Sequence, residues 1–344
     1  MSTPNPQSSR LRQILAASFL LFLIVGTVWI VRRHAGQAWQ TNEGPVFGTF
    51  FHIQYQCDED LQPLIQAELI RLDSTLSLFN NQSLLSRLNR GETQQTDTLF
   101  RSVFAIARTV SQATGGAFDI TVAPLVKAWG FGPDGTPQAP SVQTLDSLRQ
   151  VVGFSKLRLQ GEQLLKSDPR VQIDLGAIAK GFAVDRIAAV LRAHGVENFM
   201  VEIGGEIVAQ GTNPEGRPWT VGIVKPTTED ATAGLVQQVL SLGTGAMATS
   251  GNYLNFHKQG RKRIGHTIDP RTGQPVQRNI LSATVLAPNC ATADAFATAF
   301  MVLGLDSARK VVESHKELEA YLIYEDAKGQ HRVWQSPAVA AMHQ

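Results

Sequence analysis

The sequence predicts an α+β domain rather than a doubly wound α/β sheet. Hydrophobic residues make up 43% of the chain and charged residues 17%, which is a globular composition. Helical and strand-like periodicities are interleaved without a regular βα alternation. The 344 residues show no internal repeat and no clear internal boundary. We therefore expect one compact domain of mixed sheets and packed helices, preceded by one N-terminal transmembrane helix.

The predicted transmembrane helix is the segment Ile14–Val31. Its eighteen residues carry no charge and are flanked by Arg10 and Arg12 before and by Arg32 and Arg33 after. That length spans a bilayer core and exceeds the apolar region of a signal peptide. No small-residue cleavage site follows closely. We expect a retained anchor, the alternative being a buried core helix, and the balanced arginines do not choose its orientation.

The remaining boundaries follow from composition. Residues 1–13 are expected to be a short tail, 32–44 a polar tether, 45–336 the folded domain and 337–344 a C-terminal tail. Within the domain, a strand is predicted over 46–56, followed by an amphipathic helix from Asp60 onward. Asp97 is expected to cap a helix that ends near Gly115, and Ser141 is expected to open a short one.

The later elements are read from the same periodicities. A hairpin is predicted over 156–167, with its turn at Gly161 and Glu162. Further strands are expected over 199–208, 219–224, 236–242, 281–287 and 320–324. Helices are expected over 291–303 and 307–315.

Charge and cysteine content exclude several classes of function. The formal net charge is +2 and no basic stripe stands out, which argues against a nucleic-acid partner. The two cysteines, Cys57 and Cys290, lack metal-type spacing. Two buried thiols are the favoured interpretation, and a long-range disulfide stays open.

The stretch Ile173–Asp185, IDLGAIAKGFAVD, is the first candidate for chemistry. It is typical of a strand end that runs into a helix, with Asp174, Ala177 and Lys180 crowding the first two turns. A helix N-terminus suits a phosphate, and small neighbours would let one approach the backbone. The alternative is an Asp N-cap beside a solvated lysine.

A second candidate lies in the stretch Asn289–Leu303, which contains the helix predicted over 291–303. Asp294 and Thr298 are four residues apart, so a carboxylate and a hydroxyl share one face of an apolar helix. Oxygen ligands of this kind suit magnesium. An Asp stabilised by the helix dipole is the alternative.

Two loops complete the set. In GHTIDPRTGQPV (265–276), His266 and Asp269 precede a turn and are candidates to handle a proton. In GAFDITVAPLVKAWGFG (116–132), Asp119 lies among aromatic residues and glycines. That loop is either plain core or the wall of a pocket for a planar ring.

Taken in order, the motifs resemble one family. The blocks that carry the resemblance are FGTFFHIQY (47–55), SLFNNQSLLSRLN (77–89), GGAFDITVAPLVKAWGFG (115–132), IDLGAIAKGFAVD (173–185), VEIGGEIVAQG (201–211), ATSGNY (248–253), HTIDPRTGQPV (266–276) and ADAFATAFMVLG (293–304). Together they are similar to the FAD:protein FMN transferases, the ApbE-like flavin transferases. The resemblance covers roughly residues 45 to 325, and eight ordered blocks make it specific.

The resemblance implies a magnesium-dependent reaction in which FMN passes from FAD to a Thr or Ser hydroxyl of an acceptor protein and AMP leaves. It implies a magnesium shell of the Asp294 and Thr298 side chains with the backbone carbonyls of Ala177 and Ala297. The FAD contacts that it implies are Phe47, Phe79, Ala117, Phe118, Asp119, Asp174, Lys180 and Ile268.

The sequence departs from the family pattern at three points. Phe47 stands where the family usually has Met, and Phe79 where it often has Tyr, so a hydroxyl is lost there. The family's lipid-attachment cysteine is absent, and the predicted span takes its place. The resemblance thereby implies a single-pass protein of the bacterial inner membrane with its catalytic domain in the periplasm, acting on flavin-acceptor proteins of membrane redox systems.

His266 is the candidate general base, with Asp269 to orient it, because a neutral imidazole near pH 7 suits that task. Asp269 itself is the alternative base. Two other functions stay open at this point: a FAD pyrophosphatase that uses water as the nucleophile, and a membrane-tethered flavin-binding protein without turnover.

Overall fold

The computed structural model describes residues 17–27, 37–132, 139–226, 235–251, 256–259 and 262–342. Its centre is an eight-stranded sheet in the order β1-β2-β5-β6-β9-β12-β13-β14, in which every neighbouring pair is antiparallel. The strands are β1 Trp39–Val46, β2 Thr49–Gln56, β5 Phe199–Ile203, β6 Glu206–Gln210, β9 Gly245–Gly251, β12 Ile280–Ala287, β13 Glu319–Glu325 and β14 His331–Gln335. The α+β class predicted from the sequence is therefore confirmed.

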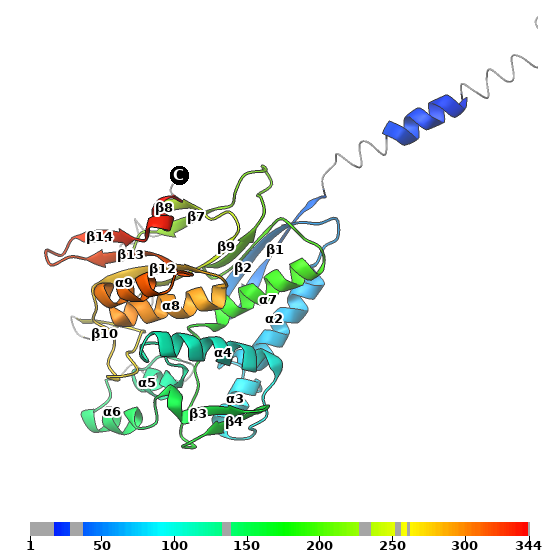
Figure 1. Ribbon diagram of the computed structural model, residues 1–344. Coiled ribbons are helices and arrows are strands. Elements are labelled where there is room, and N and C mark those ends of the chain that lie inside the picture. Colours follow the sequence, from blue (N-terminus) through cyan, green and yellow to red (C-terminus); the bar gives the residue numbers. More distant parts are fainter. Residues whose placement is uncertain are drawn as a thin grey trace, which may run out of the picture.

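Helices cover one face of this sheet (Figure 1). They are α2 Gln62–Leu76, α4 Thr98–Ala113, α7 Ala179–Ala193, α8 Cys290–Leu303 and α9 Leu305–Ser314. Asp97 caps α4 as expected, because its side chain accepts a hydrogen bond from the Phe100 N–H at 2.7 Å. The main hydrophobic core lies between these helices and the sheet.

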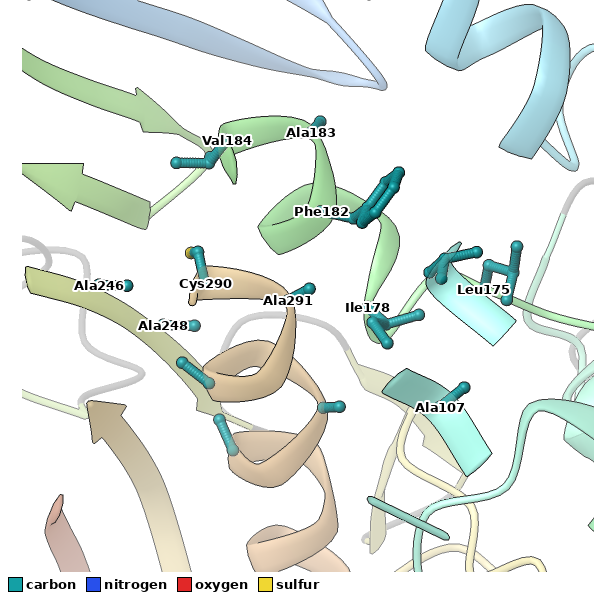
Figure 2. Packing of buried hydrophobic residues seen from close by; sticks show 14 of the residues in the cluster. Ala107, Leu175, Ile178, Phe182, Ala183, Val184, Ala246, Ala248, Cys290 and Ala291 are labelled. Atoms are coloured by element: carbon teal, nitrogen blue, oxygen red, sulfur yellow. The ribbon is translucent and has the colours of Figure 1, made fainter. Parts of the chain in front are cut away.

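Small residues make the contact between α8 and strand β9 (Figure 2). Ala246 and Ala248 of β9 are buried and lie beside the start of α8, near Cys290 and Ala291. The Cys290 thiol donates to the Met247 carbonyl at 3.3 Å. This explains why the sequence did not predict β9: its segment GAMATSG has weak strand propensity, and its small residues serve close packing instead.

The other face of the sheet is covered by a hairpin and a short helix. The hairpin joins β7 Thr220–Val224 to β8 Val236–Ser241, and the helix is α10 Pro337–Ala340. Trp219, Leu240 and Val339 are buried in a second apolar cluster on this face. The predicted C-terminal tail 337–344 is therefore wrong in part, because α10 packs onto the domain; residues 343–344 lie outside the described residues.

Shorter elements extend the helical face on one side of the molecule (Figure 1). They are α3 Leu84–Arg90, α5 Ala123–Ala128, α6 Val142–Arg149, the hairpin of β3 Leu157–Gln160 and β4 Gln163–Lys166, and the hairpin of β10 Phe256–Gln259 and β11 Lys262–Gly265. The β3–β4 hairpin turns at Gly161 and Glu162 as predicted.

Two boundaries predicted from the sequence are wrong. The tether was expected to run to Gly44, but β1 begins at Trp39. Its polar sequence is that of an edge strand, and its buried Asn42 accepts a hydrogen bond from the Tyr55 hydroxyl at 2.9 Å. The single strand expected over 199–208 is instead the β5–β6 hairpin, because Gly204 and Gly205 turn the chain with φ of 60° and 99°.

The predicted membrane span Ile14–Val31 lies partly outside the described residues. Residues 17–27 are helical, and Phe19, Leu20, Leu21 and Phe22 each expose more than half of their surface. Within the described ranges, no helix reaches the length and apolarity needed to cross a membrane. Both cysteines are free thiols; Cys290 is buried and Cys57 half-buried.

Candidate active site

A cleft of about 1130 Å³ opens where the helical face meets the middle of the sheet. It exceeds the usual range for drug-sized ligands and would hold a dinucleotide. Eleven of the fourteen site residues predicted from the sequence line it, contributed by loops, α7 and α8: Phe79, Ala117, Phe118, Asp119, Asp174, Ala177, Lys180, His266, Ile268, Asp294 and Thr298. The other three, Phe47, Asp269 and Ala297, are not among the described residues that line it.

Three charged side chains form what we call the floor of the cleft: Lys180 of α7, Glu206 of β6 and Asp294 of α8. The Lys180 ammonium group lies 2.6 Å from Glu206 Oε1. Glu206 and Asp294 are almost fully buried, with 1% and 5% of their surface exposed. When both carboxyl groups are ionised, the floor holds two negative charges and one positive charge, which leaves an excess negative charge in a region of low dielectric.

The pKa values on the floor reflect this imbalance. Burial, followed by the charge of Asp294, raises the pKa of Glu206 to about 8, although Lys180 opposes the shift. Burial likewise raises the pKa of Asp294 against the effect of Lys180. For Lys180, burial would lower the pKa, but the charges of Asp294 and Glu206 outweigh it and raise the pKa.

Helices α7 and α8 hold the floor through two backbone contacts. The Gly181 N–H donates to Asp294 Oδ2 at 3.1 Å. A Cβ at Gly181 would lie 2.4 Å from the Cys290 carbonyl oxygen and 2.8 Å from Asp294 Cβ, so only glycine permits this approach.

One turn further along α7, Asp185 fixes the beginning of α8. Its two carboxylate oxygens accept hydrogen bonds from the Cys290 and Ala291 N–H groups, both at 2.8 Å. The helix N-terminus thus receives a negative charge from its neighbour. Burial raises the pKa of Asp185 to about 6 against these two hydrogen bonds. The positions of Lys180 and Asp294 are therefore set by one rigid helix pair.

The stretch before α7 differs from its prediction. The helix begins only at Ala179, so Asp174 and Ala177 lie in the preceding loop and not in its first turns. Asp174 does not cap α7; its Oδ1 accepts from the Gly176 N–H at 2.7 Å. Burial raises the pKa of Asp174, while a charged His266 nearby would lower it. The structure thus brings Asp174 and His266 together.

Asp119 is a buried turn residue at the wall of the cleft. Its Oδ1 accepts from the Thr121 N–H and hydroxyl at 2.8 and 2.6 Å, and its Oδ2 accepts from the Phe154 N–H at 2.7 Å. Burial raises its pKa although these hydrogen bonds oppose the shift. With both oxygens occupied, Asp119 fixes the loop that places Ala117 and Phe118 on the cleft wall.

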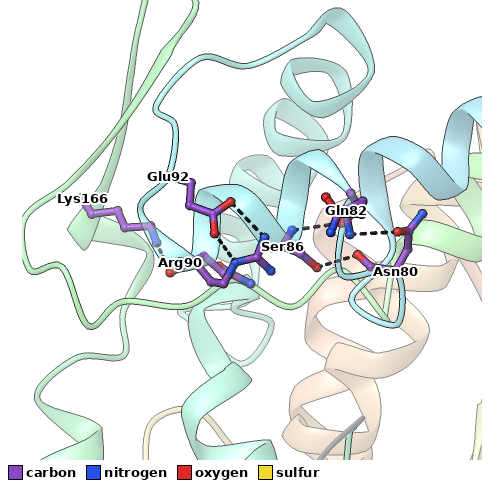
Figure 3. A network of polar contacts seen from close by, with 8 residues as sticks. Asn80, Gln82, Ser86, Arg90, Glu92 and Lys166 are labelled. Atoms are coloured by element: carbon purple, nitrogen blue, oxygen red, sulfur yellow. Dashed lines mark hydrogen bonds and ion pairs between the residues drawn. The ribbon is translucent and has the colours of Figure 1, made fainter.

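Phe79, Asp174 and His266 form what we call the rim, since each lies on a loop rather than on a regular element. Phe79 exposes 77% of its surface. Its loop is tied to α3 by Asn80, whose Oδ1 and carbonyl oxygen accept from the Gln82 N–H and the Ser86 hydroxyl (Figure 3). The loop is held by its backbone, and the ring is left open to a ligand.

Phe47 lies at the β1–β2 turn with a left-handed φ of 49°, and its side chain packs against the main core. The structure therefore gives this residue a packing contact, and its predicted contact with FAD stays a prediction.

The two residues predicted to handle a proton lie in different surroundings. His266 lines the cleft, with its ring edge-on to Phe131 at a centroid distance of 6.4 Å. Asp269 is buried in the turn that follows, where Arg271 Nε and Nη2 both donate to it at 2.9 Å. Burial would raise the pKa of Asp269, but the hydrogen bonds from Arg271 prevail and lower it. The assignment of the base to either residue stays a prediction.

The predicted magnesium shell consists of one carboxylate, one hydroxyl group and two backbone carbonyls. Asp294 and Thr298 lie on the same face of α8 and both line the cleft, as their spacing predicted. Ala177 lines the cleft as well, whereas Ala297 is fully buried. In the part of the chain that the structure describes, no three His, Cys, Asp or Glu side chains gather as a metal site.

Sequence reasoning missed Glu206. Its block VEIGGEIVAQG was noted, but no residue in it was assigned a role. The signal was present, because a carboxylate on the buried face of an apolar strand needs a partner. Its partner is Lys180. This pairing depends on the position of the β5–β6 hairpin next to α7, which the sequence alone does not predict.

Comparison with known proteins agrees with this geometry. The model of the ApbE family matches residues 47–322. A FAD:protein FMN transferase from Haemophilus influenzae is 39% identical over 302 residues, which cover 83% of this chain and 86% of that protein. The flavin transferase ApbE from Vibrio cholerae superposes with a TM-score of 0.81 at 34% identity, covering 89% of this chain and 99% of that one. The flavinyl transferase ApbE from Pseudomonas stutzeri, in its apo form, gives a TM-score of 0.80 at 30% identity, covering 89% and 97%. By sequence and by fold, the chain belongs to the ApbE family.

Proposed function

We propose that this protein is a flavin transferase that cleaves FAD and attaches FMN through a phosphoester to a Thr or Ser hydroxyl of an acceptor protein, releasing AMP. The observation that carries the proposal is the buried floor of Lys180, Glu206 and Asp294 at the bottom of a cleft large enough for a dinucleotide. Relatives that share this fold carry the name FAD:protein FMN transferase.

The floor also fits a divalent cation. Among the described residues, only the Gly181 N–H donates to the Asp294 carboxylate, which leaves lone pairs available on a hard oxygen ligand. A cation there would offset the excess negative charge of the floor and remove one cause of the raised Glu206 pKa. We propose that Asp294 and Thr298 would hold magnesium with the carbonyls of Ala177 and Ala297.

The chemistry that magnesium supplies when bound is neutralisation of charge on the pyrophosphate. The chain's own residues have separate tasks in this proposal. Lys180 is fixed by Glu206 with its ammonium group at the cleft, where it would bind a phosphate oxygen. The aromatic wall and Phe79 would flank the planar rings of FAD. His266 lines the same cleft and would take the proton of the acceptor hydroxyl.

Incubation of the purified protein with FAD, magnesium and a flavin-acceptor domain tests the proposal. Transfer yields one AMP for each flavin that stays bound to the acceptor after acid denaturation. Release of free FMN with AMP would instead identify a pyrophosphatase, and tight FAD binding without AMP would identify a flavin carrier. Omission of magnesium with chelator present should abolish AMP release.

We further propose that Ile14–Val31 anchors the protein in the inner membrane, with the catalytic domain in the periplasm. Support for the anchor comes from the uncharged stretch between arginines and from the exposed apolar surface of helix 17–27, whereas the orientation is what the family resemblance implies. A periplasm-dependent reporter fused to the C-terminus should be active, and a cytoplasm-dependent one should be silent. The opposite pattern would overturn the orientation.

A further inference from the structure

The Glu206 carboxylate has one paired oxygen and one unpaired oxygen. Oε1 lies 2.6 Å from the Lys180 ammonium group. Among the residues that the structure describes, none makes a hydrogen bond to Oε2. The side chain is 2% exposed. A buried acceptor without a donor costs free energy, so this oxygen requires an explanation.

The fold places this carboxylate at the cleft by backbone geometry. Glu206 is the first residue of β6 and directly follows the tight turn of Gly204 and Gly205. It alternates with Ile207, so it shares with Val208 the sheet face that α7 and α8 cover. Glu206 lines the cleft, so its carboxylate lies next to the space that a ligand would fill.

The chemistry of the missing partner follows from this setting. In its ionised form, which the Lys180 ammonium group on Oε1 favours against burial, Glu206 can only accept a hydrogen bond at Oε2. A phosphate oxygen also only accepts and carries negative charge, so it cannot fill the position. A ligand that fills the cleft displaces water, and it must then supply a donor or leave the oxygen buried and unpaired.

The substrates of the proposed reaction supply such donors as hydroxyl groups. The groups of FAD that adjoin its pyrophosphate are the hydroxyls of the ribityl chain and of the ribose, and the nucleophile of the acceptor is also a hydroxyl. We propose that Glu206 is a substrate-binding residue whose Oε2 accepts a hydrogen bond from a substrate hydroxyl group next to the pyrophosphate. This proposal rests on the function proposed above.

The test compares Glu206→Gln with the wild type. The Gln carbonyl can still accept from Lys180, but its NH₂ then presents a donor where the proposal requires an acceptor. The matched control is Glu68→Gln, since Glu68 is also a nearly buried glutamate and pairs with Arg186 Nε at 2.8 Å on α2, away from the cleft. Thermal unfolding verifies that both variants fold. If Glu206→Gln does not fold, Glu206→Asp replaces it, because Asp keeps the charge on a side chain one methylene shorter and so moves the carboxylate oxygens away from their position in the wild type.

Two measurements with magnesium present locate the hydroxyl. If it belongs to FAD, the Kd for FAD rises about tenfold or more in Glu206→Gln, while transfer at saturating FAD changes little. If it belongs to the acceptor, the Kd for FAD is unchanged and single-turnover transfer at saturating FAD falls about tenfold or more. Either result supports the proposal, provided that Glu68→Gln matches the wild type in both.

A double-variant cycle separates this contact from an effect through Lys180. If Glu206 only holds the lysine, Glu206→Gln adds no loss to Lys180→Gln, and the proposal is overturned. It is also overturned if Glu206→Gln stays within twofold of the wild type in both measurements. A wild-type protein that neither binds nor cleaves FAD would instead refute the proposed function, so the two failures are distinguishable.

Discussion

The floor and the rim of the cleft are built in different ways. The floor residues Lys180 and Asp294 lie on two long helices whose approach is fixed by Gly181 and Asp185. The rim residues lie on loops, and Phe79 leaves most of its ring exposed. The floor charges thus lie where the backbone is most constrained, whereas the exposed ring of Phe79 lies on a loop.

The difference indicates a division of tasks. A buried charge interacts strongly with a reacting phosphate only if it is already in place, because reorganisation would cost free energy during the reaction. An exposed ring contributes by contact area and can adjust to the ligand. We therefore expect floor variants to change turnover and Phe79 variants to change affinity, and the following predictions test this contrast in order of decreasing effect.

The largest effect is expected for Asp294→Ala. The variant removes the proposed cation ligand and should lower FAD cleavage about 10³-fold or more, with the fold retained. Single-turnover AMP release measures the loss, and circular dichroism verifies the fold. Asp306→Ala, at an exposed position in the first turn of α9, is the control and should match the wild type. Full cleavage by the wild type in metal-free buffer would show that no metal is essential.

His266→Asn tests whether one rim residue shares in the chemistry. If His266 is the base, transfer should fall by about 10²- to 10⁴-fold at an unchanged Kd for FAD, since the loss then arises in the transition state. Asp269→Asn should have the smaller effect, because Asp269 is already occupied by Arg271. A His266→Asn protein within a few-fold of wild-type activity would transfer the role to Asp269.

The third prediction concerns the helix pair beneath the floor. Burial raises the pKa of Asp185 from 3.8 to about 6, so the folded state holds its proton more tightly than the unfolded state. The stability that this proton contributes is present below pH 4 and is lost as pH rises to about 6. The free energy of unfolding of the wild type, minus that of Asp185→Asn, should fall by about 3 kcal/mol across this window. Urea titrations at several pH values measure it, and a flat difference would contradict the shift.

The smallest effect is expected at the rim. Phe79→Ala should weaken FAD binding about two- to tenfold, the usual contribution of an aromatic contact. It should leave the free energy of unfolding almost unchanged because the ring is 77% exposed. Phe50→Ala is a matched control, since Phe50 is 71% exposed on β2 and is not among the described residues that line the cleft. Equal losses in both variants would mean that Phe79 has no specific role.

Local signals in the sequence predicted the fold better than they predicted the pairing of its parts. Asp97, Ser141 and the spacing of Asp294 and Thr298 act within a few residues, and the structure shows the caps and the shared helix face that they predict. The β5–β6 turn was missed because the apolar periodicity is similar on both sides of Gly204 and Gly205, which suggested one continuous strand. The start of α7 was placed too early because Asp174 resembles an N-cap, whereas its carboxylate closes a turn before the helix.

Most of the residues that the sequence assigned to the site lie together in one cleft, on loops, α7 and α8. Eleven of the fourteen residues line one cleft because the resemblance supplied long-range information that periodicity lacks. Glu206 and Asp185 were missed for a common reason. The partner of each lies on another element, Lys180 on α7 and the N–H groups of Cys290 and Ala291 on α8, so only the tertiary structure shows what these carboxylates do.

The order of strands in the large sheet has a consequence for how the chain acquires its structure. Strand β2 pairs with β5, and all of α2 to α7 lies between them in the sequence. Pairings of such long range form slowly, because much of the chain must be ordered before they contribute stability. The β1–β2 hairpin therefore keeps an open edge until more than half of the polypeptide has emerged. We expect the β2–β5 pairing, and with it the large sheet, to form only after α2 to α7 have been synthesised.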